Sequence, residues 1–510
     1  MAFIKIKSGG IWGIDGYEID VEVDVSPGLP SFNIVGLPDV AIRESKERVR
    51  SAIKNLGFQM PQKKITVNLS PSNIKKQGTM YDLPVAVGIL ALSGHIPKKV
   101  LRDYIFLGEL SLDGKINRVN GVLPVVISLS RLGYKRFVIP TANAVEGAVV
   151  EEAEIIGVSS LGEVVDFLTG RRELLPSQID LDSYFQKQED LDIDLGEVLG
   201  QSLAKRALEI CAAGAHNMSM IGTPGSGKSM IARRIVTILP PLEFEEALEV
   251  SRIYSVAGKL DGELVTSRPF RAPHHTASEA AIIGGGSIPQ PGEISLAHRG
   301  VLFLDELPEF PRKTLEVLRQ PIEDGYINIS RAQGRVQFPA RFTLITAQNP
   351  CPCGNLGNPY KECTCTPAQI KAYNSKISQP IKDRIDIRVW VDPVEKEDLV
   401  KNKKGETSAE VRERVKRAFE IQKERFRDSD TDFNGRMTNQ EVERYCIAML
   451  EEGARKLLES AVDKFKLSGR GYFRVLKVAR TIADLEESEP ILSHHLAQAL
   501  QLRSADKDIL

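Results

Sequence analysis

The sequence lacks an excess of charge of either sign, and it lacks long apolar runs. Its 510 residues include 67 Lys and Arg against 68 Asp and Glu, which gives a net charge of −1. This balance excludes a protein that coats nucleic acid through bulk positive charge, although it leaves room for a few placed basic residues. The longest apolar run, Leu83–Leu92, is about half of a membrane span, and residues 1–10 lack the apolar stretch of a signal peptide. We therefore expect a cytoplasmic protein that does not enter membranes.

Cysteine is scarce, but its distribution is uneven. Of six cysteines in the chain, four lie within 15 residues of one another: Cys351, Cys353, Cys363 and Cys365. In a reducing compartment such a cluster indicates a metal site before disulfides, and four thiolates suit tetrahedral Zn²⁺. The C-x-C spacing is tighter than in most zinc sites, so an iron–sulfur cluster and four free thiols remain alternatives. We predict a structural zinc site.

The remaining composition is that of a globular protein with several domains. Apolar residues make up 42% and charged residues 26% of the chain, and its length predicts three or four domains. The hydropathy patterns predict, in order, a mixed α/β region, a charged linker, a second α/β region with a mainly parallel sheet, and a helical region, at residues 1–170, 171–196, 197–395 and 405–510.

Several segments carry local signals of secondary structure. Alternating polar and apolar residues predict a strand at 16–25, and Asp39 is placed to cap a helix at 40–56. We also expect strands at 64–69, 104–112 and 136–139 and a buried helix at 83–92. Near the end of the chain, Ser493 is placed to cap the last helix.

The strongest functional signal is a phosphate-binding loop. The residues Gly222, Thr223, Pro224, Gly225, Ser226, Gly227, Lys228 and Ser229 fit the G-x-x-x-x-G-K-[ST] pattern at every fixed position. The loop follows an apolar strand at 218–221 and precedes a helix expected at 230–238. Its glycines let backbone N–H groups close around phosphate oxygens. Lys228 would reach the β- and γ-phosphates of ATP, and Ser229 would bind Mg²⁺.

A pair of carboxylates supports this assignment. Asp305 and Glu306 directly follow the apolar segment 301–304. Paired with a phosphate loop, Asp305 would hold Mg²⁺ and Glu306 would activate the attacking water. We therefore predict ATP hydrolysis.

Two further residues are candidates for hydrolysis. Asn349 follows a third apolar segment, 342–348, and is placed to contact the γ-phosphate; the alternative is a turn-forming Asn before Pro350. Arg384 precedes another apolar stretch and would neutralise developing charge on a neighbouring subunit's nucleotide. The alternative for Arg384 is a surface salt bridge to Asp383 or Asp386.

Together these motifs resemble the AAA+ ATPases, and within them the magnesium-chelatase-like YifB/ComM family. The resemblance covers essentially the whole chain. It is carried by the segments SPGLPSF, VGLPD, RPFRAPHHT and NPCPCG, at residues 26–32, 35–39, 268–276 and 349–354.

The resemblance implies roles for individual residues. The Walker B pair, the first sensor and the arginine finger of the family match, in order, Asp305 and Glu306, Asn349, and Arg384. Arg470 matches the second sensor, with Arg474 as the second choice. Residues 327–342 are similar to a hairpin that points into the pore of related hexameric helicases, which makes Arg331 and Arg335 candidate DNA contacts. An ordinary exposed hairpin is the alternative.

The N-terminal region resembles the fold of Lon-type proteases, through residues 108–115. That fold cleaves peptides with a Ser nucleophile activated by a Lys. No Ser occurs at 73–92, where the nucleophile is expected, and no Lys occurs at 122–124. We expect a protease-like domain without protease activity.

The resemblance therefore implies a ring-shaped, ATP-driven DNA motor, expected to be a hexamer. Its expected task is helicase or branch-migration activity, which helps single-stranded DNA to integrate during natural transformation or recombination. The expected cofactors are ATP and Mg²⁺, with Zn²⁺ as a further candidate, and the expected partners are single-stranded or branched DNA and a recombination protein. The alternatives are a magnesium-chelatase motor subunit and a chaperone-like or protease-associated ATPase.

Overall fold

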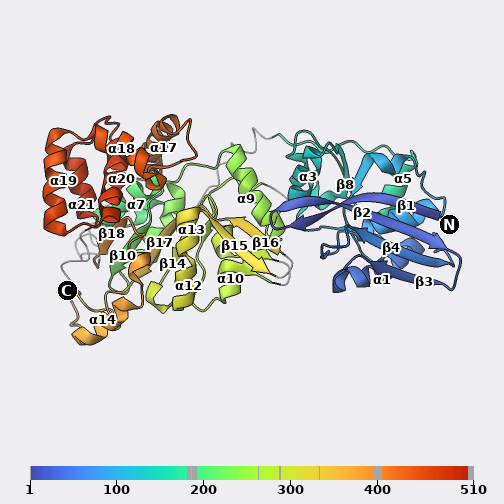
Figure 1. The fold of residues 1–510 in the computed structure, drawn as a ribbon, viewed down its shortest axis with the longest axis horizontal. Helices are drawn as coiled ribbons and strands as arrows, with labels where there is room; N and C mark the ends of the chain where they lie inside the picture. The colour runs from blue at the N-terminus through green and yellow to red at the C-terminus, as the bar shows by residue number, and fades with distance from the viewer. Residues whose placement is uncertain are drawn as a thin grey trace.

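The computed structural model describes residues 2–180, 185, 192–261, 264–286, 289–331, 334–393 and 405–503. Figure 1 shows an elongated molecule, with an N-terminal α/β part at one end, a second α/β part in the centre and a group of helices at the other end. Part of the predicted linker, at 181–184 and 186–191, lies outside the described residues. Within them, no helix combines the length and the apolar character that crossing a bilayer requires.

The N-terminal part is built on a seven-stranded mixed sheet with the strand order β3-β4-β2-β1-β5-β8-β9. Its strands are β1 (Ala2–Trp12), β2 (Asp15–Ser26), β3 (Ser31–Val35), β4 (Lys64–Ser70), β5 (Tyr104–Phe106), β8 (Arg136–Pro140) and β9 (Glu154–Val158). The alternation in β2 buries Ile19, Val21 and Val23 on one face, as predicted. The strand expected at 104–112 is interrupted, because β5 ends at Phe106 and the short β6 (Glu109–Leu110) pairs instead with β7 (Ile116–Asn117).

Helices cover this sheet, and the sequence signals locate the first two. They are α1 (Val40–Asn55), α2 (Asp82–Leu92), α3 (Val122–Arg131), α4 (Ala144–Ala148) and α5 (Leu161–Leu168). The side chain of Asp39 accepts a hydrogen bond from the Ile42 N–H at 2.8 Å, so the predicted cap is confirmed. Helix α2 is buried along almost its whole length, and Pro84 lies in its first turn, where no backbone hydrogen bond is lost.

The central part contains a five-stranded parallel sheet with the order β11-β14-β17-β10-β18. The strands are β10 (Met218–Gly222), β11 (Phe270–Arg271), β14 (Val301–Leu304), β17 (Thr343–Gln348) and β18 (Ile387–Val391). Because all of them are parallel, their carboxyl ends meet at one edge of the sheet. That edge carries the phosphate loop after β10, the carboxylate pair after β14 and Asn349 after β17.

The segments around this sheet are short helices and small strand pairs. The helices are α7 (Ser202–Gly214), α8 (Lys228–Arg233), α9 (Phe244–Val256), α10 (Glu279–Ile283), α11 (Glu293–Leu296), α12 (Arg312–Val317), α13 (Arg319–Asp324), α14 (Pro367–Ser375) and α15 (Gln379–Lys382). The helix expected at 230–238 begins earlier, at Lys228, and becomes a 3₁₀ turn at Arg234–Thr237. One small antiparallel pair of strands, β12 (Gly284–Gly285) and β13 (Gln290–Pro291), lies beside α11.

A hairpin formed by β15 (Tyr326–Arg331) and β16 (Gly334–Pro339) meets the N-terminal part (Figure 1). A Cβ atom on Gly13, in the turn between β1 and β2, would lie 2.7 Å from Val336 Cγ1. A Cβ atom on Gly334 would lie 3.1 Å from the ring of Trp12. The turn of the β1–β2 hairpin therefore packs directly against the β15–β16 hairpin.

The C-terminal part is helical. It contains α17 (Ser408–Arg425), α18 (Asn439–Tyr445), α19 (Glu452–Phe465), α20 (Gly469–Leu485) and α21 (Ser493–Gln501), and α17 and α20 pack against α7 of the central part. The cap predicted at Ser493 is wrong, because α21 begins at Ser493 and Leu492 occupies the cap position. His495 Nδ1 instead accepts a hydrogen bond from the Leu492 N–H at 3.0 Å.

Candidate nucleotide site and cysteine cluster

The phosphate loop turns between β10 and α8 through two glycines. Gly225 and Gly227 have φ angles of +79° and +90°, which other residues rarely adopt. A Cβ atom at either position would meet no atom within 4 Å, so the backbone conformation rather than crowding calls for glycine. The hydroxyls of Thr223 and Ser226 are buried and have no hydrogen-bond partner among the described residues. Unpartnered polar groups in a glycine-rich turn before a helix suit a bound phosphate.

Lys228 connects this loop with Asn349. Its Nζ donates hydrogen bonds to the carbonyl oxygens of Gly222 and Thr223, at 2.7 and 2.8 Å, and to Asn349 Oδ1 at 3.4 Å. Burial lowers the pKa of the Lys228 ammonium below its ordinary value, while the carboxylates of Asp305 and Glu306 oppose this shift. The structure thus brings the predicted lysine and the predicted sensor into one contact.

Ser229 and Asp305 form the second contact of the site. The Ser229 hydroxyl donates to Asp305 Oδ2 at 2.6 Å, and Asp305 Oδ1 accepts from the Glu306 N–H at 2.9 Å. A hydroxyl and a carboxylate oxygen side by side are the hard ligands that Mg²⁺ prefers. These two residues therefore fit the magnesium role that the sequence assigned to them.

Glu306 has an unusual backbone conformation and a histidine partner. Its φ is +51°, a left-handed conformation that is strained for a residue with a side chain. Glu306 Oε2 lies 3.4 Å from His275 Nδ1. The pair His274-His275 was visible in the sequence, but its distance of about thirty residues from Glu306 gave no sign of this contact.

Arg384 lies at the opposite end of the sheet from the phosphate loop. Its carbonyl oxygen accepts a hydrogen bond from Asn217 Nδ2 at 2.9 Å, just before β10 begins. Its guanidinium is buried and contacts Glu323 Oε1 at 2.6 Å and the Pro380 carbonyl at 2.7 Å. The salt bridge considered as the alternative role is therefore formed with Glu323, on α13, and not with Asp383 or Asp386.

The two candidates for the second sensor differ in their surroundings. Arg470 is exposed in the first turn of α20, and its side chain forms no hydrogen bond or ion pair within the described residues. Arg474, one turn further along, forms an ion pair with the buried Asp386. Burial by itself would raise the pKa of Asp386, but Arg474 and His216 outweigh it, so this pKa lies below its ordinary value. Neither arginine contacts the phosphate loop of its own chain in the described structure.

The candidate DNA contacts lie on the β15–β16 hairpin. Arg335 is exposed, and its Nε donates to Asn328 Oδ1 at 3.1 Å. Arg331 is the last residue of β15 and its side chain lies outside the described residues. The predicted hairpin exists, with Ser330 opposite Arg335.

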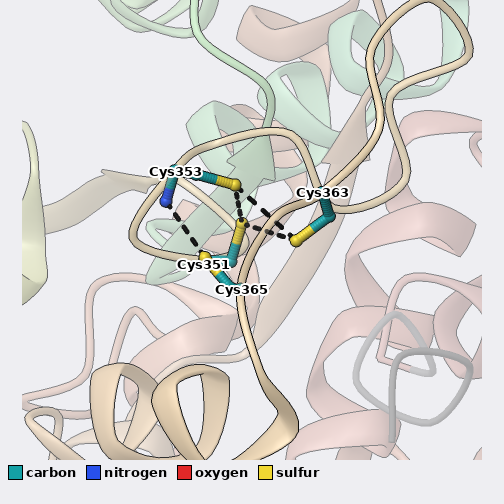
Figure 2. Close-up of side chains that lie close together, drawn as sticks. All are labelled: Cys351, Cys353, Cys363 and Cys365. Atoms are coloured by element: carbon teal, nitrogen blue, oxygen red, sulfur yellow. Dashed lines mark hydrogen bonds between the residues drawn. The ribbon is translucent and has the colours of Figure 1, made fainter.

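The four clustered cysteines converge on one point (Figure 2). Cys351 Sγ lies 3.4 Å from Cys353 Sγ and 3.6 Å from Cys363 Sγ, and the Sγ atoms of all four, Cys365 included, lie within 4.8 Å of one another. These separations exclude disulfides. In a tetrahedral site with Zn–S bonds of about 2.3 Å, the sulfur atoms would lie about 3.8 Å apart. The cluster therefore has the dimensions of a four-thiolate metal site.

The four thiols differ in their electrostatic surroundings: the pKa of Cys353 is lowered, whereas burial raises the pKa of Cys351, and the pKa values of Cys363 and Cys365 are also raised. Hydrogen bonds from the backbone N–H groups of Asn355 and Thr364 lower the pKa of Cys353 to about 5. The Leu356 N–H is directed at Cys351 Sγ, at 3.4 Å. Thiolates, not thiols, are the ligands of zinc.

A parallel sheet with a phosphate loop, an adjacent carboxylate pair and a sensor at the next strand defines an ATPase of the AAA+ class. Family models agree with this class: "Magnesium chelatase, subunit ChlI" matches residues 194–399, "Subunit ChlI of Mg-chelatase" matches 21–143, and "Magnesium chelatase, subunit ChlI C-terminal" matches 405–503.

Similar proteins define the family more narrowly. The chain is 42% identical over 508 residues to competence protein ComM of Haemophilus influenzae, and 41% identical over 514 residues to the uncharacterized protein YifB of Escherichia coli. Each alignment covers 99% of this chain and 98% of the relative. The chain belongs to the YifB/ComM family of magnesium-chelatase-like ATPases.

A partial similarity concerns another class of protein. The archaeal Lon protease of Methanocaldococcus jannaschii is 28% identical over 170 residues, which cover 31% of this chain and 26% of that protein. The expected Lon-type relationship is thus found for part of the chain. In the two segments where a protease would carry its nucleophile and its lysine, Met80 and Leu123 are buried apolar residues.

Proposed function

We propose that this ATPase is a ring-shaped motor that moves branched or single-stranded DNA, with branch migration during natural transformation or recombination as its task. The proposed cellular process, natural transformation, is suggested by the name of the competence protein to which the chain is similar. A hexamer is the proposed assembly, and the cytoplasm is the proposed location. A recombination protein is the proposed additional partner.

The observation that carries the proposal is the direct connection between the ATP site and the hairpin. Strand β16 ends at Pro339, and β17, which leads to Asn349, begins at Thr343. A change at Asn349 on loss of the γ-phosphate can therefore be passed along one strand to the exposed Arg335. An exposed arginine such as Arg335 suits the phosphate groups of DNA, which would make binding dependent on salt.

The position of Arg384 supports a ring. Its backbone bonds to Asn217 at the amino end of β10, and the phosphate loop follows the carboxyl end, about 13 Å away along the strand. Arg384 is therefore remote from its own nucleotide, and to reach that of a neighbouring subunit its buried guanidinium would have to leave Glu323. In this role it would stabilise the charge that develops on the γ-phosphate.

The proposed cofactors are ATP with Mg²⁺, and Zn²⁺ at the cysteine cluster. The phosphate loop and Lys228 would hold the phosphates, while Ser229 and Asp305 would hold Mg²⁺, which neutralises phosphate charge. Glu306 would orient a water molecule and take its proton. The four cysteines would hold Zn²⁺ as a structural ion.

A magnesium-chelatase motor is the second candidate, because the matching family models describe a chelatase subunit. The two candidates differ in what stimulates hydrolysis. DNA with a branch should accelerate a DNA motor, whereas a chelatase motor should respond only to its metal-inserting partner.

The deciding experiment supplies ATP, Mg²⁺ and a labelled four-stranded DNA junction to the purified protein. We expect ATP-dependent strand displacement by the wild type and a loss of at least about 100-fold in Glu306→Gln. Glu279→Gln, a matched change of a solvent-exposed Glu that pairs with Lys313, should keep the wild-type rate. Hydrolysis that ignores DNA, or equal displacement by Glu306→Gln, would refute the DNA motor.

The hairpin and the N-terminal part can be tested in the same preparation. Arg335→Ala should weaken displacement several-fold, while Arg427→Ala, also at an exposed arginine, should not. We further propose that the N-terminal part does not cleave peptides, so casein should stay intact in the presence of ATP. Cleavage of casein by the wild type would contradict this.

A further inference from the structure

The loop that carries the four cysteines lies against the nucleotide site. It begins directly after Asn349, and Cys351 is fully buried two residues further on. Between β17, which ends at Gln348, and α14, which begins at Pro367, the described chain contains no helix or strand. Two turns, from the Gly354 N–H to the Cys351 carbonyl and from the Asn358 N–H to the Asn355 carbonyl, supply backbone hydrogen bonds. A cross-link within such a segment would reduce the number of conformations open to it.

The first half of the loop contacts the phosphate loop itself. A Cβ atom on Gly354 would lie 2.6 Å from Pro224 Cγ and 2.7 Å from its Cδ, so the two loops touch with no room between them. Gly354 also has a φ of +78°. A few residues later, a Cβ atom on Gly357 would lie 2.9 Å from the ring of Trp390, on β18. The loop therefore packs against the phosphate loop at Gly354 and against β18 at Gly357.

The second half of the loop leads into the wall of a hollow beside the catalytic groups. Cys365 directly precedes Thr366, which caps α14 by accepting a hydrogen bond from the Gln369 N–H at 3.3 Å. Gln369 and Tyr373 of this helix line a hollow of about 500 Å³ together with Glu306 and Asn349. The cysteine cluster therefore lies between Asn349 and α14, which both line this hollow.

We infer that the cysteine loop, closed by Zn²⁺ on Cys351, Cys353, Cys363 and Cys365, is a positioning element of the ATP site. The ion would cross-link both halves of the loop, and the loop would hold Pro224 and Asn349 in the geometry that recognises the γ-phosphate. The inference rests on the proposed roles of the phosphate loop and Asn349. It predicts that zinc acts on catalysis from a distance, since none of its ligands would touch the nucleotide.

Two variants separate the effect of zinc binding from the effect of the packing between Gly354 and Pro224. Cys363→Ser removes one thiolate, and we expect the zinc content to fall from one ion per chain to well below one. Gly354→Ala keeps all four thiols but forces a methyl group against Pro224, so zinc should stay at one ion per chain. Both variants should lower kcat at least tenfold.

Each variant has a matched control. Cys446→Ala changes a cysteine outside the cluster. Gly133→Ala changes a glycine with a φ of +95° whose Cβ atom would meet no atom within 4 Å, so it shares the backbone strain of Gly354→Ala without the contact. Both controls should keep the zinc content and kcat of the wild type, and melting temperatures should show that all four variants are folded.

A binding measurement keeps the test independent of hydrolysis and of DNA. The wild type should bind a non-hydrolysable ATP analogue more tightly than ADP, because only the former reaches Asn349. Cys363→Ser and Gly354→Ala should lose most of this preference while their Kd for ADP with Mg²⁺ changes less than threefold. Failure of DNA stimulation would refute the DNA motor and leave this preference measurable.

Three results would overturn the inference. The first is a wild-type protein without bound metal, or with iron and sulfide in place of zinc. The second is a zinc-free Cys363→Ser that keeps the preference for the ATP analogue. The third is a Gly354→Ala that keeps both this preference and the wild-type kcat.

Discussion

The carboxyl ends and the amino ends of the central parallel strands form two edges of the sheet, the carboxyl edge and the amino edge. Both are rich in polar residues, but these residues have different roles at the two edges. At the carboxyl edge, Lys228, Ser229 and Asn349 face an open site, and two buried hydroxyls of the phosphate loop have no partner among the described residues. At the amino edge, Asp386 is buried and bonded to the Asn217 N–H at 2.9 Å and to Arg474. Two buried atoms at the amino edge, His216 Nδ1 and Arg384 Nε, also lack a hydrogen bond within the described residues, but each belongs to a side chain that is paired through another nitrogen. The carboxyl edge differs in that the whole hydroxyl groups of Thr223 and Ser226 are unpartnered in the part of the chain that the structure describes.

The amino edge instead fixes the C-terminal helices to the sheet. Arg474 belongs to α20, so its ion pair with Asp386 joins the helical part to the start of β18. His216 adds a second link, because its Nε2 lies 2.7 Å from the Thr481 hydroxyl, also on α20. Polar groups that are satisfied within the protein contribute to stability, whereas those held ready for a ligand contribute to activity.

Lys228→Ala gives the largest expected effect and tests the carboxyl edge. Loss of the ammonium should lower kcat for ATP at least about 100-fold, because it removes the charge that faces the phosphates. The free energy of unfolding should fall by only about 1 kcal/mol or less, because the ammonium is buried at a cost and its removal offsets the loss of two hydrogen bonds to loop carbonyls. Steady-state hydrolysis and urea unfolding measure the two effects. Lys313→Ala, at an exposed lysine, is the control, and a loss of activity there would undermine the assignment.

Arg474→Ala should have the opposite profile. It leaves the carboxylate of Asp386 buried without its cation, which should cost about 3 kcal/mol of unfolding free energy. Arg470→Ala, one turn away at an exposed position, should change stability by less than about 0.5 kcal/mol. Equal destabilisation by the two variants in urea would contradict the proposed difference between these arginines.

The pH dependence of Arg474→Ala follows from the pKa of Asp386. Because this pKa is lowered in the folded protein, the ion pair stabilises the fold above the ordinary value of 3.8 and loses its contribution as the pH falls through the lowered pKa. The stability gap between wild type and Arg474→Ala should therefore be widest near neutral pH. It should shrink as acid protonates the carboxylate.

Local signals made the carboxyl edge predictable from the sequence, whereas the amino edge was not. The phosphate loop is one contiguous run, and Asp305 and Asn349 each directly follow an apolar strand, so their meeting point follows from parallel strands. The partner of Arg384 could not be predicted, because Glu323 lies sixty residues away on a short helix. Adjacent acids suggested a local salt bridge, but tertiary packing placed the guanidinium elsewhere.

A similar reason explains the error at Ser493. A serine before an apolar stripe suits a helix cap, but the imidazole of His495 accepts a hydrogen bond from the free Leu492 N–H, and the helix starts one residue earlier than a cap at Ser493 would require. Two further contacts could not be predicted for the same reason. His275 contacts Glu306, and Gly354 packs against Pro224, through tertiary packing that no short sequence pattern encodes.

An asparagine at each edge offers a matched comparison of intermediate size. Asn349→Ala should lower kcat about tenfold or more with little change in stability, because its side chain faces Lys228 and the site. Asn217→Ala should reduce the unfolding free energy by about 1–2 kcal/mol, because its side chain bonds to the Arg384 carbonyl and to the Leu344 N–H, each at 2.9 Å. Its kcat well below the melting temperature should stay within about threefold of wild type. If Asn349→Ala kept the wild-type kcat, its role as a sensor would be wrong.

The variant with the smallest expected effect tests whether the N-terminal part influences the carboxyl edge of the central sheet. Gly13→Ala places a methyl group against Val336 of the β15–β16 hairpin, whereas Gly57→Ala, at an equally left-handed glycine, meets no atom within 4 Å. Both variants should share a backbone cost of about 1 kcal/mol. Only Gly13→Ala should disturb the hairpin, and we expect it to reduce the stimulation of hydrolysis by branched DNA about two- to threefold at unchanged basal rate. Equal stimulation in the two variants would show that the hairpin moves independently of the N-terminal part. The carboxyl edge would then depend on the central sheet and its cysteine loop alone.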